Sequence, residues 1–182
     1  MNTIYLARET VSDFGTEVSQ ATGQDIVRCY QCGNCTAGCP YTEFFDYPVS
    51  QIMRMIQTGQ REKALSSKAI WLCATCETCS TRCPCEIDVA DVMDGLRNIA
   101  YREKRFTEKD IRTFYEAFLS SLKNHGRIFE LEIIARYNLK SGHLLTDADL
   151  GPKVMKQLHF LPKRIKGRDN VACIVKRFME NK

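Results

Sequence analysis

The sequence predicts a mainly α-helical protein, and three features of its pattern indicate this class. Apolar residues recur at intervals of three and four in several segments, which places them on one face of a helix. Runs that alternate between apolar and polar residues, as in strands, are almost absent. Glycine and proline fall between the periodic segments, where helices begin and end.

The N-terminal part of the chain is predicted to form short helices. Residues 9–20 are expected to be helical, with Phe14 and Val18 four positions apart on one face. Pro48 stands near the first position of a second helix, where its missing N–H is tolerated, and Gly59 ends that helix. The apolar face of the second helix consists of Ile52, Met53 and Ile56.

Two further helices are predicted around residues 61–100. A short helix at about 61–70 precedes Trp71. Asp88 is a favourable N-cap, because its carboxylate can accept a hydrogen bond from the first turn of the next helix. The apolar face of that helix consists of Val89, Val92, Met93, Leu96 and Ile99.

Two apolar stripes continue the helical pattern toward the C-terminus. The first ends at Gly126 and consists of Ile111, Phe114, Tyr115, Phe118, Leu119 and Leu122. The second ends near Gly142 and consists of Ile128, Leu131, Ile134 and Ala135. We therefore expect an N-terminal segment over residues 1–20, a cysteine-rich domain over 21–105 and a helical arm over 106–182.

An internal repeat of cysteines is the most informative feature of the sequence. Residues 29–40 read CYQCGNCTAGCP and residues 73–84 read CATCETCSTRCP, so both follow the frame C-x2-C-x2-C-x3-C-P. Three cysteines at intervals of three cannot converge from a straight helix. Each run is therefore expected to be a tight loop around a small group, which Gly33, Ala37 and Gly38 allow the backbone to approach closely.

The frame is that of bacterial proteins with two [4Fe-4S] clusters, in which the fourth cysteine of each run ligates the other cluster. We therefore predict an α-helical, ferredoxin-like domain that binds two such clusters. The expected ligands of the first cluster are Cys29, Cys32, Cys35 and Cys83. The expected ligands of the second cluster are Cys73, Cys76, Cys79 and Cys39.

Other uses of the ten cysteines fit the spacing less well than iron–sulfur clusters do. Two four-cysteine zinc sites would also need eight cysteines, but they usually pair C-x2-C with a distant C-x2-C. A disulfide framework is not expected in an intracellular chain. Cys85 and Cys173 are surplus. Cys85 is predicted to be a free thiol, although its place directly after the second Cys-Pro leaves a ligand role open, and Cys173 is predicted to pack in an apolar segment.

Composition and charge narrow the classes of function. With 44% apolar residues, the chain can bury a core, which argues against intrinsic disorder. No apolar run approaches the roughly 18 residues that span a membrane, and the first residues do not match a secretory signal, so we expect a cytoplasmic protein. Residues 101–182 carry 18 basic and 10 acidic residues, which we interpret as a solvated surface that docks on another protein. A zinc module that binds nucleic acid stays as the competing hypothesis.

The cysteine runs and the segments around them resemble the C subunit of heterodisulfide reductase. The resemblance rests on DIVRCYQCGNCTAGCPYTEFFDYPVSQIMRMIQTG and WLCATCETCSTRCPCEIDVADVMDGLRNIA, and more weakly on LPKRIKG at residues 161–167. It implies a non-catalytic subunit of an oxidoreductase that relays electrons through the two clusters. Similar cysteine runs occur in iron–sulfur subunits of the succinate dehydrogenase, glycolate oxidase and glycerol-phosphate oxidase types.

The resemblance also implies partners. In that family the C subunit lies between a flavin-bearing A subunit, which splits electron pairs, and a catalytic B subunit, which reduces the mixed disulfide of coenzyme M and coenzyme B in methanogenesis. Hydrogenase or formate dehydrogenase modules feed the complex. Residues 106–182 would dock on these partners, with Phe114, Phe118 and Leu122 packing and Lys163, Arg164 and Lys166 at the rim. The alternative is a relay subunit of a sulfur-oxidising, acetogenic or hydroxy-acid oxidoreductase complex.

Overall fold

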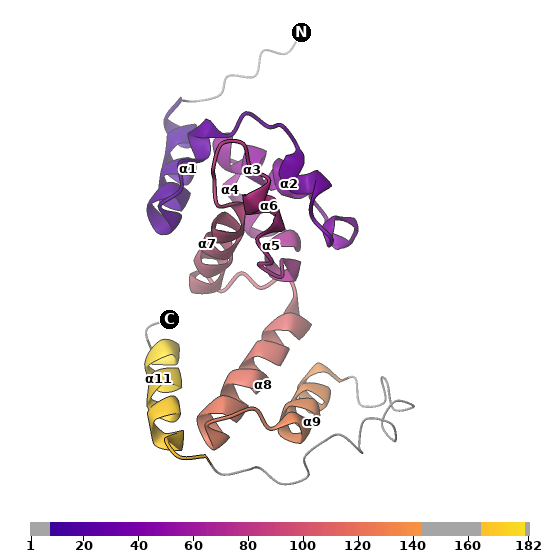
Figure 1. Ribbon diagram of the computed structural model, residues 1–182, viewed down its shortest axis with the longest axis vertical. Helices are drawn as coiled ribbons and strands as arrows, with labels where there is room; N and C mark the ends of the chain where they lie inside the picture. Colours follow the sequence, from indigo (N-terminus) through magenta and orange to yellow (C-terminus); the bar gives the residue numbers. More distant parts are fainter. Residues whose placement is uncertain (1–7, 143–164, 181–182) are drawn as a thin grey trace. The chain divides into compact units, whose positions relative to one another are not determined.

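The protein is mainly α-helical, as predicted. The structure is a computed structural model that describes residues 8–142 and 165–180, and these two ranges contain helices and no strand (Figure 1). The chain divides into two compact units, Met1–Thr107 and Glu108–Lys182. In the described part of the chain, no helix has both the length and the apolar character needed to cross a membrane.

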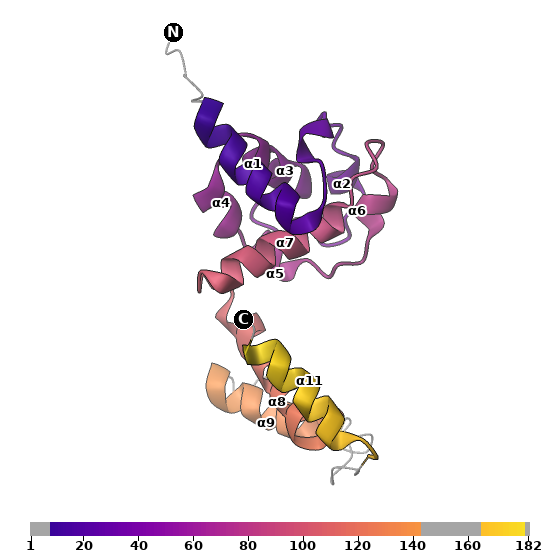
Figure 2. The same ribbon diagram turned by 90° about the vertical axis from the view of Figure 1, so that its left-hand side faces the viewer.

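The first unit is built around three longer helices and several single turns. Its elements are α1 (Arg8–Thr22), η1 (Ile26–Arg28), α2 (Asn34–Ala37), η2 (Thr42–Phe44), α3 (Val49–Gln57), α4 (Arg61–Leu65), α5 (Ala69–Leu72), α6 (Thr78–Thr81) and α7 (Val89–Arg102). Helix α1 packs on both α3 and α7, and Figure 2 shows it lying across them. The predicted pair Phe14 and Val18 is buried in this core.

The predicted starts of α3 and α7 are confirmed. Pro48 immediately precedes α3 in an extended conformation. The carboxylate of Asp88 accepts a hydrogen bond from the Asp91 N–H at 3.0 Å and another from the Ser80 hydroxyl at 2.7 Å. Ser80 in turn accepts from the N–H of Ala90 at 3.0 Å. Because Ser80 belongs to α6, this network joins the second cysteine run to the start of α7.

The helix predicted at 61–70 is wrong in one respect, because the structure has two short helices there. Helix α4 ends at Leu65 and α5 begins at Ala69. Between them the carboxylate of Asp46 accepts hydrogen bonds from the Ser67 hydroxyl at 2.6 Å, the Lys68 N–H at 2.9 Å and the Ala69 N–H at 3.1 Å. These bonds satisfy the N–H groups at the start of α5. In a continuous helix, the same N–H groups would have bonded to carbonyls of the preceding turn.

Replacing Asp46 with alanine should destabilise the first unit by about 1–2 kcal/mol, the usual cost of losing a helix cap. Partial burial acts to raise the pKa of Asp46, but its hydrogen bonds from Ser67, Lys68 and Ala69 outweigh this and lower the pKa below 3.8. The stabilisation should therefore be complete above about pH 4 and fade as acid protonates the carboxylate. Denaturant unfolding at several pH values measures both effects. Glu43→Ala, at an exposed carboxylate, is the control; an equal loss there would contradict the capping role.

The second unit consists of three helices in its described residues: α8 (Lys109–His125), α9 (Glu130–Ser141) and α11 (Arg168–Glu180). Helix α8 packs on both of the others. Gly126 ends α8 with a positive φ of 74°, a conformation that glycine adopts without strain. A Cβ at this position would lie 2.9 Å from the Cα of Arg168, so the glycine also allows α11 to approach.

The apolar stripes predicted for this unit are only partly buried. The buried positions of α8 and α9 are Ala117, Ser121 and Ile133, whereas Phe114 of α8, Ile134 of α9 and Ile128 between them are exposed. The small residues of α8 let the neighbouring helices pack closely, so the larger side chains lie at the edge of the contact.

The prediction that Cys173 packs is also wrong, because its side chain in α11 is exposed, whereas Val175 two positions later is buried. The two residues lie on different sides of α11. Lys163 and Arg164, predicted at the rim of a docking surface, lie outside the described residues.

Candidate iron–sulfur site

The two cysteine runs fold into loops of the same design. Each leaves a short helix, η1 or α5, and leads into a one-turn helix, α2 or α6. Gln31 and Thr75 occupy equivalent positions with φ of 65° and 49°, and Gly33 and Glu77 do so with φ of 82° and 61°. A positive φ is strained for residues other than glycine, so the strained positions are Gln31 in the first loop and Thr75 and Glu77 in the second. Backbone of alternating hand is typical of loops that wrap anions and iron–sulfur groups.

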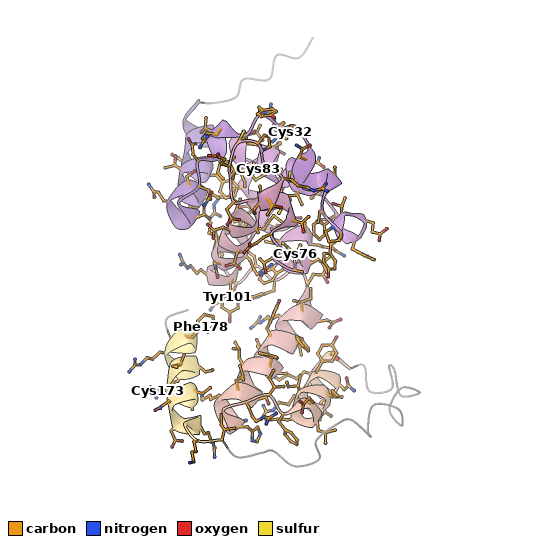
Figure 3. All side chains as sticks on the ribbon, viewed as in Figure 1. Cys32, Cys76, Cys83, Tyr101, Cys173 and Phe178 are labelled. Atoms are coloured by element: carbon orange, nitrogen blue, oxygen red, sulfur yellow. The ribbon has the colours of Figure 1, made fainter. Side chains whose placement is uncertain are left out.

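The eight predicted ligands gather in two pockets. The first pocket is lined by Cys29, Cys32 and Cys35 of the first run and by Cys83 of the second. The second pocket is lined by Cys73, Cys76 and Cys79 of the second run and by Cys39 of the first. In Figure 3, Cys32 and Cys83 lie near one another and Cys76 lies apart from them. Each pocket therefore receives three cysteines from one run and the fourth from the other.

The longer helices close the two pockets from equivalent positions. Helix α3 contributes Met53 to the first pocket and α7 contributes Met93 to the second. Both methionines are about 1% exposed, as expected from their places on the apolar faces of their helices. Val49 and Val89, the first residues of these helices, each line the pocket of the opposite helix. The side of each pocket formed by the helices is therefore apolar.

Two polar side chains that sequence reasoning missed hold the starts of the loops. Gln57 of α3 donates from Nε2 to the carbonyl of Cys29 at 2.7 Å. Arg97 of α7 donates from Nη2 to the carbonyl of Cys73 at 2.7 Å. Both lie in correctly predicted helices but 24 to 28 residues from their partners. A single sequence has no signal for such a distant side-chain contact.

Burial sets the protonation of several cysteines. It raises the pKa of Cys35 to about 11, against an opposing effect of the Thr36 N–H. Burial also raises the pKa of Cys73 and Cys79. The hydroxyl of Thr78, 3.5 Å from the sulfur of Cys76, lowers the pKa of that thiol. Cys35, Cys73 and Cys79 are thus protonated at neutral pH, and binding of iron must release their protons.

The donors of the pockets fit iron–sulfur clusters. In a zinc site the four sulfurs lie about 2.3 Å from one ion. Among the side chains that the structure describes, no three of His, Cys, Asp or Glu converge on one metal ion. Four thiolates around a larger group suit an iron–sulfur cluster.

The two surplus cysteines differ in their surroundings. Cys85 lines the first pocket beside the four predicted ligands. Its Sγ–H donates to the carbonyl of Arg28 at 2.9 Å, which fixes the loop that enters the first run. Cys173 belongs to the second unit.

Replacing either surplus cysteine should leave the metal content unchanged. We expect Cys85→Ala to retain about eight iron atoms per chain, since two four-iron clusters need only eight cysteines. The variant should be slightly less stable, because the Arg28 carbonyl loses its donor. Iron and acid-labile sulfide are the quantities to measure, with Cys173→Ala as the matched control. A fall of iron to half in Cys85→Ala would make Cys85 a ligand.

A comparison with protein families identifies the class of the domain. Residues 25–87 match a family described as the 4Fe-4S dicluster domain. The match includes both cysteine runs, so the first unit contains a domain for two [4Fe-4S] clusters. The predicted cofactors are thereby confirmed, and the zinc alternative is set aside.

The relatives of the chain belong to methanogen enzymes. The chain is 36% identical to the C subunit of the H(2):CoB-CoM heterodisulfide,ferredoxin reductase of Methanothermobacter thermautotrophicus. The alignment spans 88 residues, which is 48% of each of the two chains. The chain is 37% identical over 103 residues to the C subunit of the ferredoxin:CoB-CoM heterodisulfide reductase of Methanosarcina mazei, covering 57% of this chain and 63% of the relative. The C2 subunit of the H(2)/formate:CoB-CoM heterodisulfide,ferredoxin reductase of Methanococcus maripaludis is 30% identical over 135 residues, 74% of this chain and 61% of that protein.

The resemblance to the C subunit of heterodisulfide reductase is thus confirmed over the aligned residues. The chain spans about half the length of the Methanothermobacter relative.

Proposed function

We propose that the chain is a non-catalytic electron-transfer subunit of a cytoplasmic heterodisulfide reductase complex. The observation that carries this proposal is the pair of cysteine-lined pockets, each of which combines three cysteines of one run with the fourth cysteine of the other, in a relative of the reductase's C subunits. Exchange of the fourth cysteine ties the two sites together, which suits passage of electrons between them.

The proposed ligands are those predicted from the sequence. Cys29, Cys32, Cys35 and Cys83 hold one cluster, and Cys73, Cys76, Cys79 and Cys39 hold the other. Such clusters accept and release single electrons. The chain itself supplies thiolates, an apolar lining from Met53 and Met93, and fixed loops.

The proposed partners follow from the relatives and from the chemistry of the substrate. The relative from Methanosarcina mazei is named for a reductase of the CoB-CoM heterodisulfide. Reducing a disulfide takes two electrons, whereas [4Fe-4S] clusters pass electrons one at a time. We therefore propose that another protein of the complex holds the half-reduced disulfide between the two transfers. We propose that a flavin-bearing A subunit donates electrons, that a B subunit reduces the disulfide, and that a hydrogenase or formate dehydrogenase lies upstream.

We further propose that residues 106–182 dock on these partners. Within the described part of the second unit, large apolar side chains are exposed at Phe114, Tyr115, Ile134, Leu139, Ile174 and Phe178. Aromatic and aliphatic side chains of this kind are typical of interface centres. The positive charge of this half of the chain would act mainly on the rate and salt dependence of association.

Reconstitution tests the proposal. The iron-loaded chain, reduced chemically, should not reduce the disulfide of coenzyme M and coenzyme B. Adding the B subunit should allow turnover with a viologen dye, and adding the A subunit should extend it to physiological donors. Turnover by the chain alone would contradict the proposal. Co-purification with a hydroxy-acid flavoprotein, and with no disulfide reductase, would favour the related oxidoreductase complexes instead.

A further inference from the structure

The two pockets are equivalent in design but differ in charge. The exposed Glu77 of the second loop takes the position of Gly33 in the first, and a less exposed position beside each pocket carries an amide in one case and a cation in the other. Gln57 and Arg97 are each the ninth residue of α3 and α7, counted from the first helical residue. Gln57 binds the carbonyl of Cys29 at 2.7 Å and the carbonyl three residues earlier at 3.1 Å. Arg97 binds the carbonyl of Cys73 at 2.7 Å and the carbonyl three residues earlier at 2.8 Å. A neutral amide at the first pocket is therefore replaced by a cation at the second.

The charge of Arg97 lies where solvent screens it little. Its side chain is 17% exposed. Asp94 pairs with Nη1 at 3.2 Å, on a different nitrogen from the one that binds the Cys73 carbonyl, and is 47% exposed. Asp94 also accepts a hydrogen bond from Asn98 at 3.1 Å. In the Arg97–Asp94 ion pair, the more buried guanidinium of Arg97 thus contacts the cysteine loop, whereas the carboxylate of Asp94 is more exposed to solvent.

The cations near the first pocket do not match this arrangement, and Arg28, which precedes Cys29, is exposed. Arg54 is exposed and reaches the side-chain oxygen of Gln57 at 3.5 Å, so it touches the amide rather than the loop. Arg82 packs against Gly38 and stands next to Cys83, a first-pocket residue, and close to Cys39, a second-pocket residue. Its charge therefore does not distinguish the two sites.

We infer that Arg97 raises the reduction potential of the cluster in the second pocket above that of the cluster in the first. Reduction adds a negative charge, and a nearby buried cation stabilises the more negative state. Electrons entering the chain then pass from the first pocket to the second. This inference rests on the proposed function, to which it adds a direction.

The test is a redox titration of the iron-loaded full chain followed by electron paramagnetic resonance. Arg97→Gln copies the first site and should lower the higher of two midpoint potentials. The equilibrium constant for electron transfer between the clusters should fall on the order of tenfold, or about 59 mV for a one-electron couple. Arg97→Lys should keep most of the difference, because it keeps the charge. Asp94→Asn should increase the difference, and the exposed Arg102→Gln of the same helix should not change it.

The reciprocal variant keeps the inference testable if Arg97→Gln fails to bind iron. Gln57→Arg should raise the lower potential toward the higher. The inference is overturned if Arg97→Gln and Arg97→Lys shift the potential equally, since Arg97 would then act only by positioning the loop, or if Arg54→Gln shifts a potential as much. A wild-type chain with fewer than two clusters would instead contradict the proposed function.

Discussion

Replacing Cys83 with alanine should remove the cluster of the first pocket, although Cys83 belongs to the second cysteine run. Cys83 lines the pocket that contains Cys29, Cys32 and Cys35, and alanine offers no ligand. Iron should fall from about eight to about four atoms per chain. Cys39→Ala should cause an equal loss of iron, but from the second pocket.

The loss of the first cluster and the loss of the second are distinguished by comparison with reference variants. Cys32 and Cys76 serve as references, because each belongs to the run that supplies most of its pocket. The spectrum of Cys83→Ala should match that of Cys32→Ala, and the spectrum of Cys39→Ala should match that of Cys76→Ala. Iron analysis and electron paramagnetic resonance of the four variants provide the comparison. If Cys83→Ala matched Cys76→Ala, each run would close its own cluster and the crossed ligand set would be wrong.

Removing the iron should unfold much of the first unit and leave the second unit folded. Binding free energy of a metal group is folding free energy where the ligands are brought together by the fold. Without iron, the two pockets lose the group that their thiols enclose. The strained backbone at Gln31, Thr75 and Glu77 is then no longer stabilised by bonds from the neighbouring cysteines to iron. The second unit is a separate compact unit, and its single cysteine is Cys173.

Hydrogen exchange before and after anaerobic chelation measures this effect segment by segment. Amides of residues 29–42 and 73–86 should lose protection by several orders of magnitude, and those of α3 and α7 should follow. Amides of α8 and α9 should change little. Equal loss of protection in both units would show that they unfold together, and no loss in either would show that iron does not stabilise the fold.

The helices of the first unit could be predicted from the sequence because their signals are local. Pro48 and Asp88 mark helix starts through their own chemistry, and the structure has α3 and α7 beginning directly after them. The cysteine frame likewise indicated two iron–sulfur clusters from spacing alone. It also grouped Cys83 with the first run, and the lining of the first pocket agrees with that grouping.

The errors arose where contacts distant in sequence decide the outcome. The break between α4 and α5 depends on Asp46, about twenty residues earlier, and no pattern within 61–70 reveals it. The apolar stripe of α8 includes Phe114, which is 44% exposed, whereas the buried positions of this helix are Ala117 and Ser121. Periodicity identifies an apolar face but does not tell which part of that face another helix covers.

Counting electrons tests the central claim most directly. The iron-loaded full chain is titrated anaerobically with a one-electron reductant while iron, visible absorbance and paramagnetic resonance are followed. The account predicts about eight iron atoms and an uptake of two electrons per chain, each by a separate one-electron centre. Replacing Cys39 or Cys83 should reduce the uptake to one electron. A chain that holds zinc, or that takes up a single electron with all eight cysteines present, would contradict the account.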